Sequence, residues 1–186
     1  MNRAPIYLAA LALVAGGERA AIAKVDAAED THLAVSTELD IAASPHALWA
    51  VMVTPSRWWS GEHSWSGDAR NFWMTVRPGG CFCETLPPSK DRKARGFVEH
   101  ARVIYADPAS LMRLSGVFGP LQSEALTGTM SLTIKPGADG KTSKLEMTYS
   151  VAGYSRIPLK PVAPVVDKVL AEQMQRLKVA AESSAR

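Results

Sequence analysis

Two segments in the C-terminal half of the chain alternate strictly between apolar and polar residues, and this pattern constrains the fold more than any other. Residues 129–134 and 145–151 each carry an apolar side chain at every second position, and a turn sequence at 136–140 separates them. An antiparallel strand with one buried and one solvated face produces this alternation, whereas a parallel strand covered on both faces would be apolar throughout. The two segments therefore predict an antiparallel pair whose apolar face needs a cover.

A long amphipathic segment over residues 161–181 can supply that cover. Its apolar residues fall on one stripe at helical spacing: Val162, Val165, Val166, Val169, Leu170, Met174 and Leu177. Charged and amide residues occupy the other side, as on a helix that lies with one face on a protein core. We therefore expect a C-terminal helix against the apolar face of the sheet.

The preceding residues predict further strands and two short helices. Residues 33–41 alternate as a half-buried strand, Ser44-Pro45 has the character of an N-cap and first helical residue, and residues 57–60 indicate a second short helix or turn. Further strands are predicted at 72–77, 81–86, 96–105 and 111–115. Segregated strands and helices of this kind indicate an α+β domain. We expect a curved antiparallel sheet of about seven strands around the C-terminal helix.

The N-terminus has the pattern of a secretory signal. A positive charge at Arg3 is followed by about ten apolar residues and by the small-x-small sequence that ends at Ala23. The apolar stretch is too short to span a bilayer. We therefore expect cleavage after Ala23, with a retained membrane anchor as the alternative, because Glu18 and Arg19 make the cleavage region unusually charged.

This reading divides the chain into a signal peptide (1–23), a flexible leader (24–31), a globular domain (32–182) and a short tail (183–186). The expected product is exported, and is periplasmic if the source is a Gram-negative bacterium. Apart from the signal, no stretch of the sequence is long and apolar enough to span a membrane.

Composition excludes some partners. Apolar residues make up 47% of the chain and charged residues 21%, which is ordinary for a globular domain, and the net charge is only +3. The one basic cluster, residues 90–95, lies among glycine and proline residues and is read as a solvated loop. Nucleic acid is therefore not an expected partner, since a phosphate-binding surface needs more positive charges on one face.

Cys81 and Cys83 are the two cysteines of the chain, and Phe82 separates them. In an extended strand, residues two apart lie roughly 6.5 Å apart at Cα with parallel side chains, so a bond between them would be strained. We expect two buried apolar thiols, with intermolecular pairing or a local bulge as alternatives in an oxidising compartment.

The order of elements, together with several short motifs, resembles the START-like, Bet v 1-like superfamily (SRPBCC). The motifs are Ser44-Pro45-x-x-x-Trp49, Trp58-Trp59, Arg77-Pro78-Gly79-Gly80-x-Phe82-x-Glu84, Gly96-x-Val98 and Asp107-Pro108-x-x-x-Leu111. The resemblance covers residues 33–180 and is strongest to the Hsp90-ATPase-activator-homology and polyketide cyclase/dehydrase branches. It implies a helix-grip fold around a cavity for hydrophobic small molecules, and some relatives catalyse cyclisation or dehydration. Export would argue against activation of a cytosolic chaperone.

The same reading yields candidate ligand-binding residues. They are Trp58, Trp59 and Trp65 near the mouth, Met130, Leu132, Met147, Tyr149 and Val151 on the sheet, and Val166, Leu170 and Met174 on the helix. A pocket for a small molecule is mostly apolar with a few convergent polar groups. Ordinary core packing is the competing interpretation for the sheet and helix residues, because any amphipathic element buries such side chains.

Glu84 is the one candidate catalytic residue, as a buried carboxylate for acid or base chemistry. Its possible partners are Tyr149, His63 and His100. A structural hydrogen bond is the competing interpretation. No metal or cofactor is expected, because Cys-x-Cys on a strand lacks the usual zinc spacing and no phosphate-binding or dinucleotide glycine pattern occurs.

Three functions remain open. The first is an exported carrier of a lipid-like or aromatic molecule, the second is an enzyme of the cyclase or dehydratase type, and the third is a protein-interaction module without a ligand. A deep pocket without a buried ionisable group would favour the carrier. Glu84 hydrogen-bonded beside a tyrosine or histidine would favour the enzyme, and a filled interior would contradict both.

Overall fold

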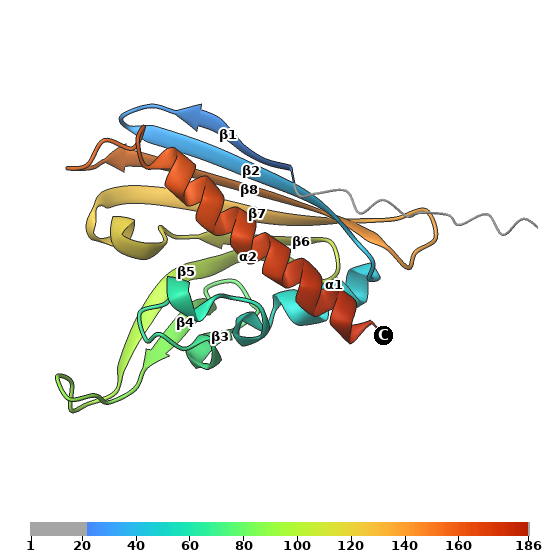
Figure 1. Cartoon of the computed structure of the whole chain (residues 1–186), viewed down its shortest axis with the longest axis horizontal. Helices are drawn as coiled ribbons and strands as arrows, with labels where there is room; N and C mark the ends of the chain where they lie inside the picture. Colours follow the sequence, from blue (N-terminus) through green and yellow to red (C-terminus); the bar gives the residue numbers. More distant parts are fainter. Residues whose placement is uncertain (1–21, 186) are drawn as a thin grey trace, which may run out of the picture.

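A computed structural model describes residues 22–185, which form one eight-stranded antiparallel sheet and a long C-terminal helix (Figure 1). The strands are β1 (Ile22–Ala28), β2 (His32–Ile41), β3 (Phe72–Met74), β4 (Cys81–Leu86), β5 (Gly96–Asp107), β6 (Leu111–Ser115), β7 (Ala125–Pro136) and β8 (Ser143–Tyr154). The helices are α1 (Pro45–Met52) and α2 (Ala163–Ser184), with the 3-10 turns η1 (Pro55–Arg57), η2 (Gly61–His63), η3 (Ala69–Asn71) and η4 (Gly119–Ser123).

The predicted hairpin forms the centre of the sheet. Strand order is β1-β2-β8-β7-β6-β5-β4-β3, and β7 pairs with β8 so that Leu132 lies opposite Met147. The apolar residues of β2, β7 and β8 are buried beneath α2, which crosses one face of the sheet (Figure 1). The predicted α+β architecture and the helix that covers the sheet are therefore confirmed.

The first short helix is confirmed, whereas the second short element lies earlier in the chain than the predicted residues 57–60 and shares only Arg57 with them. The Ser44 hydroxyl caps α1 by accepting a hydrogen bond from the backbone N–H of Ala47 at 3.3 Å, and the second short element is the single turn η1. Helix α2 continues through Ser184, so the predicted tail at 183–186 begins within the helix.

The prediction of a flexible leader at 24–31 is wrong. Residues 22–28 form the edge strand β1, which pairs with β2 from Ile22 opposite Glu38 to Ala28 opposite Leu33. Backbone hydrogen bonds hold this strand, and its side chains are mostly exposed, so its sequence shows no alternation. The sheet has eight strands instead of about seven for this reason.

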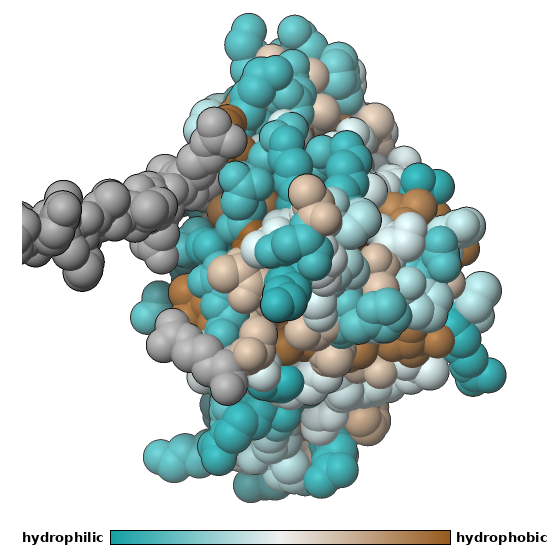
Figure 2. Space-filling model, turned by 90° about the vertical axis from the view of Figure 1, so that its right-hand side faces the viewer, coloured by the Kyte–Doolittle hydropathy of each residue, from teal (hydrophilic) through white to brown (hydrophobic). Residues whose placement is uncertain are grey.

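The predicted signal segment lies almost entirely outside the described residues. Its estimated cleavage point after Ala23 falls inside β1. Within residues 22–185, no helix combines the length and apolar character needed to cross a bilayer. The face shown in Figure 2 is mostly hydrophilic, with small hydrophobic patches between polar side chains.

Candidate functional site

A cavity of about 470 Å³ lies between the sheet and the N-terminal half of α2. The helical wall is aliphatic and consists of Val162, Val165, Val166, Val169 and Leu170. Further along the helix the interior is filled, because Met174, Leu177 and Ala181 are fully buried. The cavity therefore lies at the N-terminal end of the helix, next to the filled part of the interface.

The opposite wall is aromatic. Trp59, Phe118 and Tyr149 line it, with ring centroids 5.8 Å apart for Trp59 and Phe118 and 5.3 Å apart for Phe118 and Tyr149. The η4 turn, residues 119–121, closes one end. Edge and stacked contacts of this kind hold aromatic rings in fixed orientations, so the wall is preformed.

Part of the rim of the cavity consists of exposed apolar side chains. Trp65, Ile157 and Val165 line it and are 53%, 50% and 60% exposed. Grouped exposed apolar side chains are a feature of surfaces that contact proteins, membranes or ligands. The cavity is therefore reached from solvent between the tryptophan loop (residues 58–67), α2 and the segment after β8.

The tryptophan loop is attached to α2 by three polar contacts. The buried Gln173 side chain accepts a hydrogen bond from the Ser60 N–H at 2.8 Å, and Arg176 donates to the Trp58 carbonyl at 2.9 Å. At the mouth, the His63 ring contacts the Glu172 carboxylate at 3.2 Å. These contacts fix the loop as one side of the opening. Gln173 was not predicted to be part of the site. The sequence signal that could have identified it is a single amide side chain among the apolar residues of the helix.

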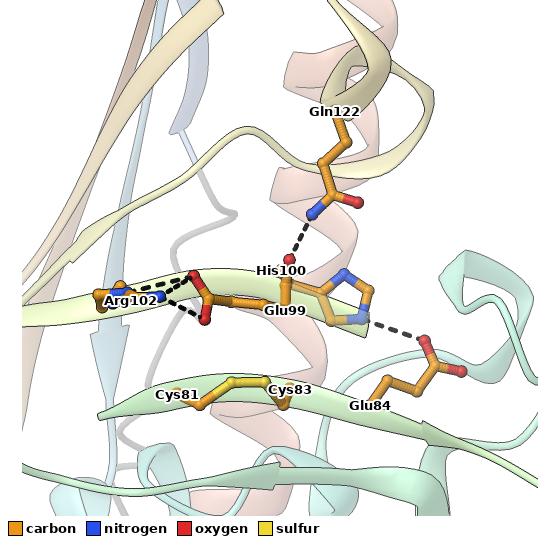
Figure 3. The surroundings of a disulfide bond; sticks show 7 residues. All are labelled: Cys81, Cys83, Glu84, Glu99, His100, Arg102 and Gln122. Atoms are coloured by element: carbon orange, nitrogen blue, oxygen red, sulfur yellow. Dashed lines mark hydrogen bonds and ion pairs between the residues drawn. A yellow bond between two sulfur atoms is a disulfide. The ribbon is translucent and has the colours of Figure 1, made fainter. Parts of the chain in front are cut away.

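Beside the cavity, a buried carboxylate and imidazole form a pair across two strands (Figure 3). His100 Nε2 lies 3.1 Å from Glu84 Oε2, and the exposed fractions of the two residues are 4% and 0%. Glu84 also accepts hydrogen bonds from the backbone N–H groups of Trp65, at 3.0 Å, and Ser66, at 2.5 Å. The predicted partnership of Glu84 with a histidine is thus formed. The two backbone hydrogen bonds to Glu84 connect β4 to the tryptophan loop.

A β-bulge places His100 in the interior. Phe82 pairs with Ala101 and Cys83 pairs with Glu99, so His100 is an extra residue in β5. Both His100 and Ala101 are consequently buried, although successive residues of a regular strand face opposite sides. Bulges redirect side chains in this way and are common beside functional sites.

The hydrogen bonds of Glu84 determine which nitrogen of His100 carries the proton. Because both carboxylate oxygens accept from backbone N–H groups, Glu84 acts as an acceptor, and the imidazole donates from Nε2. Burial lowers the pKa of His100, against an opposing contribution from Glu84, so the ring is neutral at pH 7. Nδ1 is then an unprotonated acceptor. It has no hydrogen-bond partner among the described residues, and His100 lines the cavity.

The lowered pKa of His100 predicts a pH dependence of stability. The unfolded chain takes up a proton at His100 near pH 6.5, whereas the folded chain resists it, so stability is complete above that pH. We expect the free energy of unfolding to decrease as the pH falls from 6.5 toward the folded pKa. Urea denaturation at pH 7 and pH 5 measures this loss. The His100→Phe variant should lose less over the same interval, and equal losses in the two proteins would contradict the assignment.

Tyr149 has a structural role at the cavity wall. Its hydroxyl accepts a hydrogen bond from the Phe118 N–H at 3.2 Å and donates to the Gly116 carbonyl at 3.3 Å. Burial raises the pKa of Tyr149 well above its ordinary value, so the phenol stays neutral. Glu84 is hydrogen-bonded to neither Tyr149 nor His63, the other two predicted partners.

Cys81 and Cys83 form a disulfide bond on β4, which corrects the expectation of two free thiols (Figure 3). Their Cα atoms are 5.4 Å apart, less than in a flat strand and within the range that a disulfide spans. They lie opposite Arg102 and Glu99, whose side chains pair on the outer face of the sheet. The disulfide therefore faces away from the cavity.

The structure brings together five of the eleven predicted ligand-binding residues. Trp59, Trp65, Tyr149, Val166 and Leu170 line the cavity. The other six are buried outside its lining: Trp58, Met130, Leu132, Met147, Val151 and Met174. Periodicity identifies which side chains point inward, but it does not show where the helix stands away from the sheet.

Several lining residues were not predicted. Phe118, the η4 turn and Ile157 lie in irregular segments whose sequences carry no periodic signal. His100 was considered only as a partner of Glu84. Within residues 22–185, no group of three or more histidine, cysteine or acidic side chains is arranged to hold a metal ion.

Comparison with known proteins identifies the fold alone. No protein-family model matches the sequence, and no functionally curated protein shows a significant match. Among solved structures, SA2116 from Staphylococcus aureus, a protein of unknown function, superposes with a TM-score of 0.57 at 14% identity over 82% of this chain and 95% of its own. EF2215 from Enterococcus faecalis, also of unknown function, superposes with a TM-score of 0.55 at 13% identity over 88% of this chain and 79% of its own. An uncharacterised protein from Rhizobium leguminosarum superposes with a TM-score of 0.55 at 16% identity over 87% of this chain and 99% of its own.

Proposed function

We propose that this protein binds a small, largely apolar molecule in the cavity between α2, the aromatic wall and the tryptophan loop. The observation that carries the proposal is the cavity itself. Its volume of about 470 Å³ lies within the range of small-molecule sites, and its walls are apolar with few polar groups, as such sites are. The resemblance to START-like proteins supports it, because the sheet and the C-terminal helix are compatible with a helix-grip fold.

The proposed carrier acts after export, in the periplasm of a Gram-negative source. The support is the N-terminal signal pattern read from the sequence. In that compartment a protein with an open apolar cavity can shield a poorly soluble molecule from water. The third hypothesis, an interaction module with a filled interior, has less support because the interior contains a cavity.

A second candidate function is an enzyme of the cyclase or dehydratase type, and the buried pair of Glu84 and His100 favours it. A neutral imidazole held by a carboxylate can accept a proton from a bound substrate through its second nitrogen. A general acid on the opposite side would complete such a site. The Tyr149 hydroxyl already makes two hydrogen bonds to backbone groups, so it is poorly placed for that role. The histidine partner of Glu84 meets the condition stated above for the enzyme; we nevertheless place binding first, because Tyr149 does not supply the general acid that such a site needs.

Native mass spectrometry of the full chain tests this proposal. Protein purified from its own source without denaturation should carry a copurified small molecule, which organic extraction would release for identification. A chain that remains free of any adduct across several growth conditions would count against a carrier. Conversion of the extracted molecule by fresh protein would instead favour the enzyme.

A further inference from the structure

We infer that the ligand is a neutral molecule with a planar ring system and a hydroxyl group, and that this hydroxyl donates a hydrogen bond to Nδ1 of His100. The inference rests on the proposed function, because it names the class of ligand for the same cavity. It follows from the polar groups, the charges and the shape of the lining.

Several polar side chains of the lining already have hydrogen-bond partners within the protein. The Ser64 hydroxyl donates to the Gly61 carbonyl at 2.7 Å and accepts from the Gly67 N–H at 2.9 Å. The Tyr149 hydroxyl is engaged twice, and His63 is paired with Glu172. Apart from the acceptors of Glu62 and His63 at the mouth, His100 Nδ1 is thus the side-chain nitrogen of the lining that has no hydrogen-bond partner among the described residues. A pure hydrocarbon would cover this acceptor without replacing its hydrogen bond to water, so a ligand that donates to it is favoured.

The charges around the cavity are unfavourable for an anionic ligand. Among the described residues, no lysine or arginine belongs to the lining, whereas Glu62 and the His63–Glu172 pair lie at the mouth and Glu84 lies behind His100. An anionic ligand such as a fatty acid would lose its hydration without gaining a positive partner, and it would meet negative charge. The lining therefore selects against carboxylates and in favour of neutral ligands.

The shape of the cavity suits a flat ligand. The two long walls of the cavity are the aromatic rings of Trp59 and Phe118 and the aliphatic stripe of α2. Aromatic rings prefer offset-stacked or edge contacts with other rings, which favours a flat ligand between these walls. At the share of liquid volume taken by a water molecule, 470 Å³ holds about 15 waters. One or two fused rings with a hydroxyl fit such a space.

A matched series of naphthalenes separates the effect of a hydroxyl group on affinity from the effect of a negative charge. Calorimetric titration of the full chain into naphthalene, 2-naphthol and 2-naphthoate should give tightest binding for 2-naphthol. We expect naphthalene to bind about tenfold more weakly, as the loss of one hydrogen bond predicts, and 2-naphthoate to bind more weakly still. Equal affinity for naphthalene and 2-naphthol would overturn the inference and leave the proposed function standing. Failure of all three to bind would count against the proposed function itself.

The Glu84→Gln variant provides a sharper readout. A glutamine amide can donate to His100 Nε2, which would move the ring proton to Nδ1 and turn that atom from an acceptor into a donor. 2-Acetylnaphthalene accepts hydrogen bonds but cannot donate them. We expect the ratio of its affinity to that of 2-naphthol to be about tenfold higher in the variant than in the wild type. The matched control is Glu99→Gln, on the outer face of the next strand. This variant should bind 2-naphthol and 2-acetylnaphthalene with the same relative affinities as the wild type.

Nitrogen-15 NMR of the wild-type imidazole keeps the inference testable if the variant does not fold. The Nδ1 resonance should have the shift of an unprotonated nitrogen and should move on addition of 2-naphthol but not of naphthalene. A protonated Nδ1 in the free protein, or the same response to both ligands, would overturn the assignment of His100 as the hydroxyl acceptor.

Discussion

Glu84→Leu should lower the free energy of unfolding by about 3–5 kcal/mol, because three donors lose the acceptor they share, at about 1–3 kcal/mol for each donor left unpaired in the interior. Leucine has a similar volume, so the loss arises from hydrogen bonds and not from a large cavity. The Trp65 N–H, the Ser66 N–H and His100 all lose their acceptor in the interior. Because small domains are stable by only about 5–15 kcal/mol, the variant should unfold at a much lower urea concentration.

The control for this experiment is Glu99→Leu. Glu99 pairs with Arg102 on the exposed outer face, where such a pair contributes about 0–1 kcal/mol. Urea denaturation followed by tryptophan fluorescence measures both variants. If Glu84→Leu were no more destabilising than Glu99→Leu, the hydrogen bonds to the Glu84 carboxylate would not stabilise the fold as inferred.

Val166→Trp should abolish binding of naphthalene or of the natural ligand, with an affinity loss of about 100-fold or more, equivalent to about 2.8 kcal/mol. Val166 lies on the helical wall of the cavity, and an indole at this position would occupy the space that the ligand needs. The cavity accommodates the larger side chain, so the cost in stability should stay within the roughly 1–3 kcal/mol typical of overpacking. Calorimetry and native mass spectrometry measure the loss.

Val179→Trp is the matched control on the same helix. Val179 is 54% exposed and lies outside the cavity lining, so the same substitution there should leave binding unchanged. Normal binding by the Val166→Trp variant would show that the ligand lies elsewhere. Equal losses in both variants would indicate a general effect on the helix instead of occupation of the cavity.

The strands with one buried face were predictable because alternation is a local property. Residues 111–115 were predicted with the bounds that the structure has, and β2 differs by one residue. Residues 81–86 do not alternate, and their bounds were predictable from the turn at Pro78-Gly79-Gly80 that precedes them. The edge strand β1 was not predictable, since its stability comes from backbone pairing with β2, which leaves no trace in its own side chains.

The candidate site was predictable only in part. Glu84 was identified as a buried carboxylate with His100 among its possible partners, and that pair is present. The bulge that turns His100 inward depends on the register between β4 and β5, which pairing across strands decides. The lining from η4 and Ile157 likewise depends on where irregular segments come to lie in space.

The sequence by itself determined the antiparallel sheet, the amphipathic cover and the inward side of each regular element, because side-chain period follows directly from local backbone geometry. Only the tertiary structure decided where the interior stays open. Met147 and Tyr149 both point inward, but Met147 fills the core and Tyr149 borders the cavity. The separation between α2 and the sheet decides which of these roles an inward residue takes. That separation is set by all the side chains packed between the two layers, so no single segment encodes it.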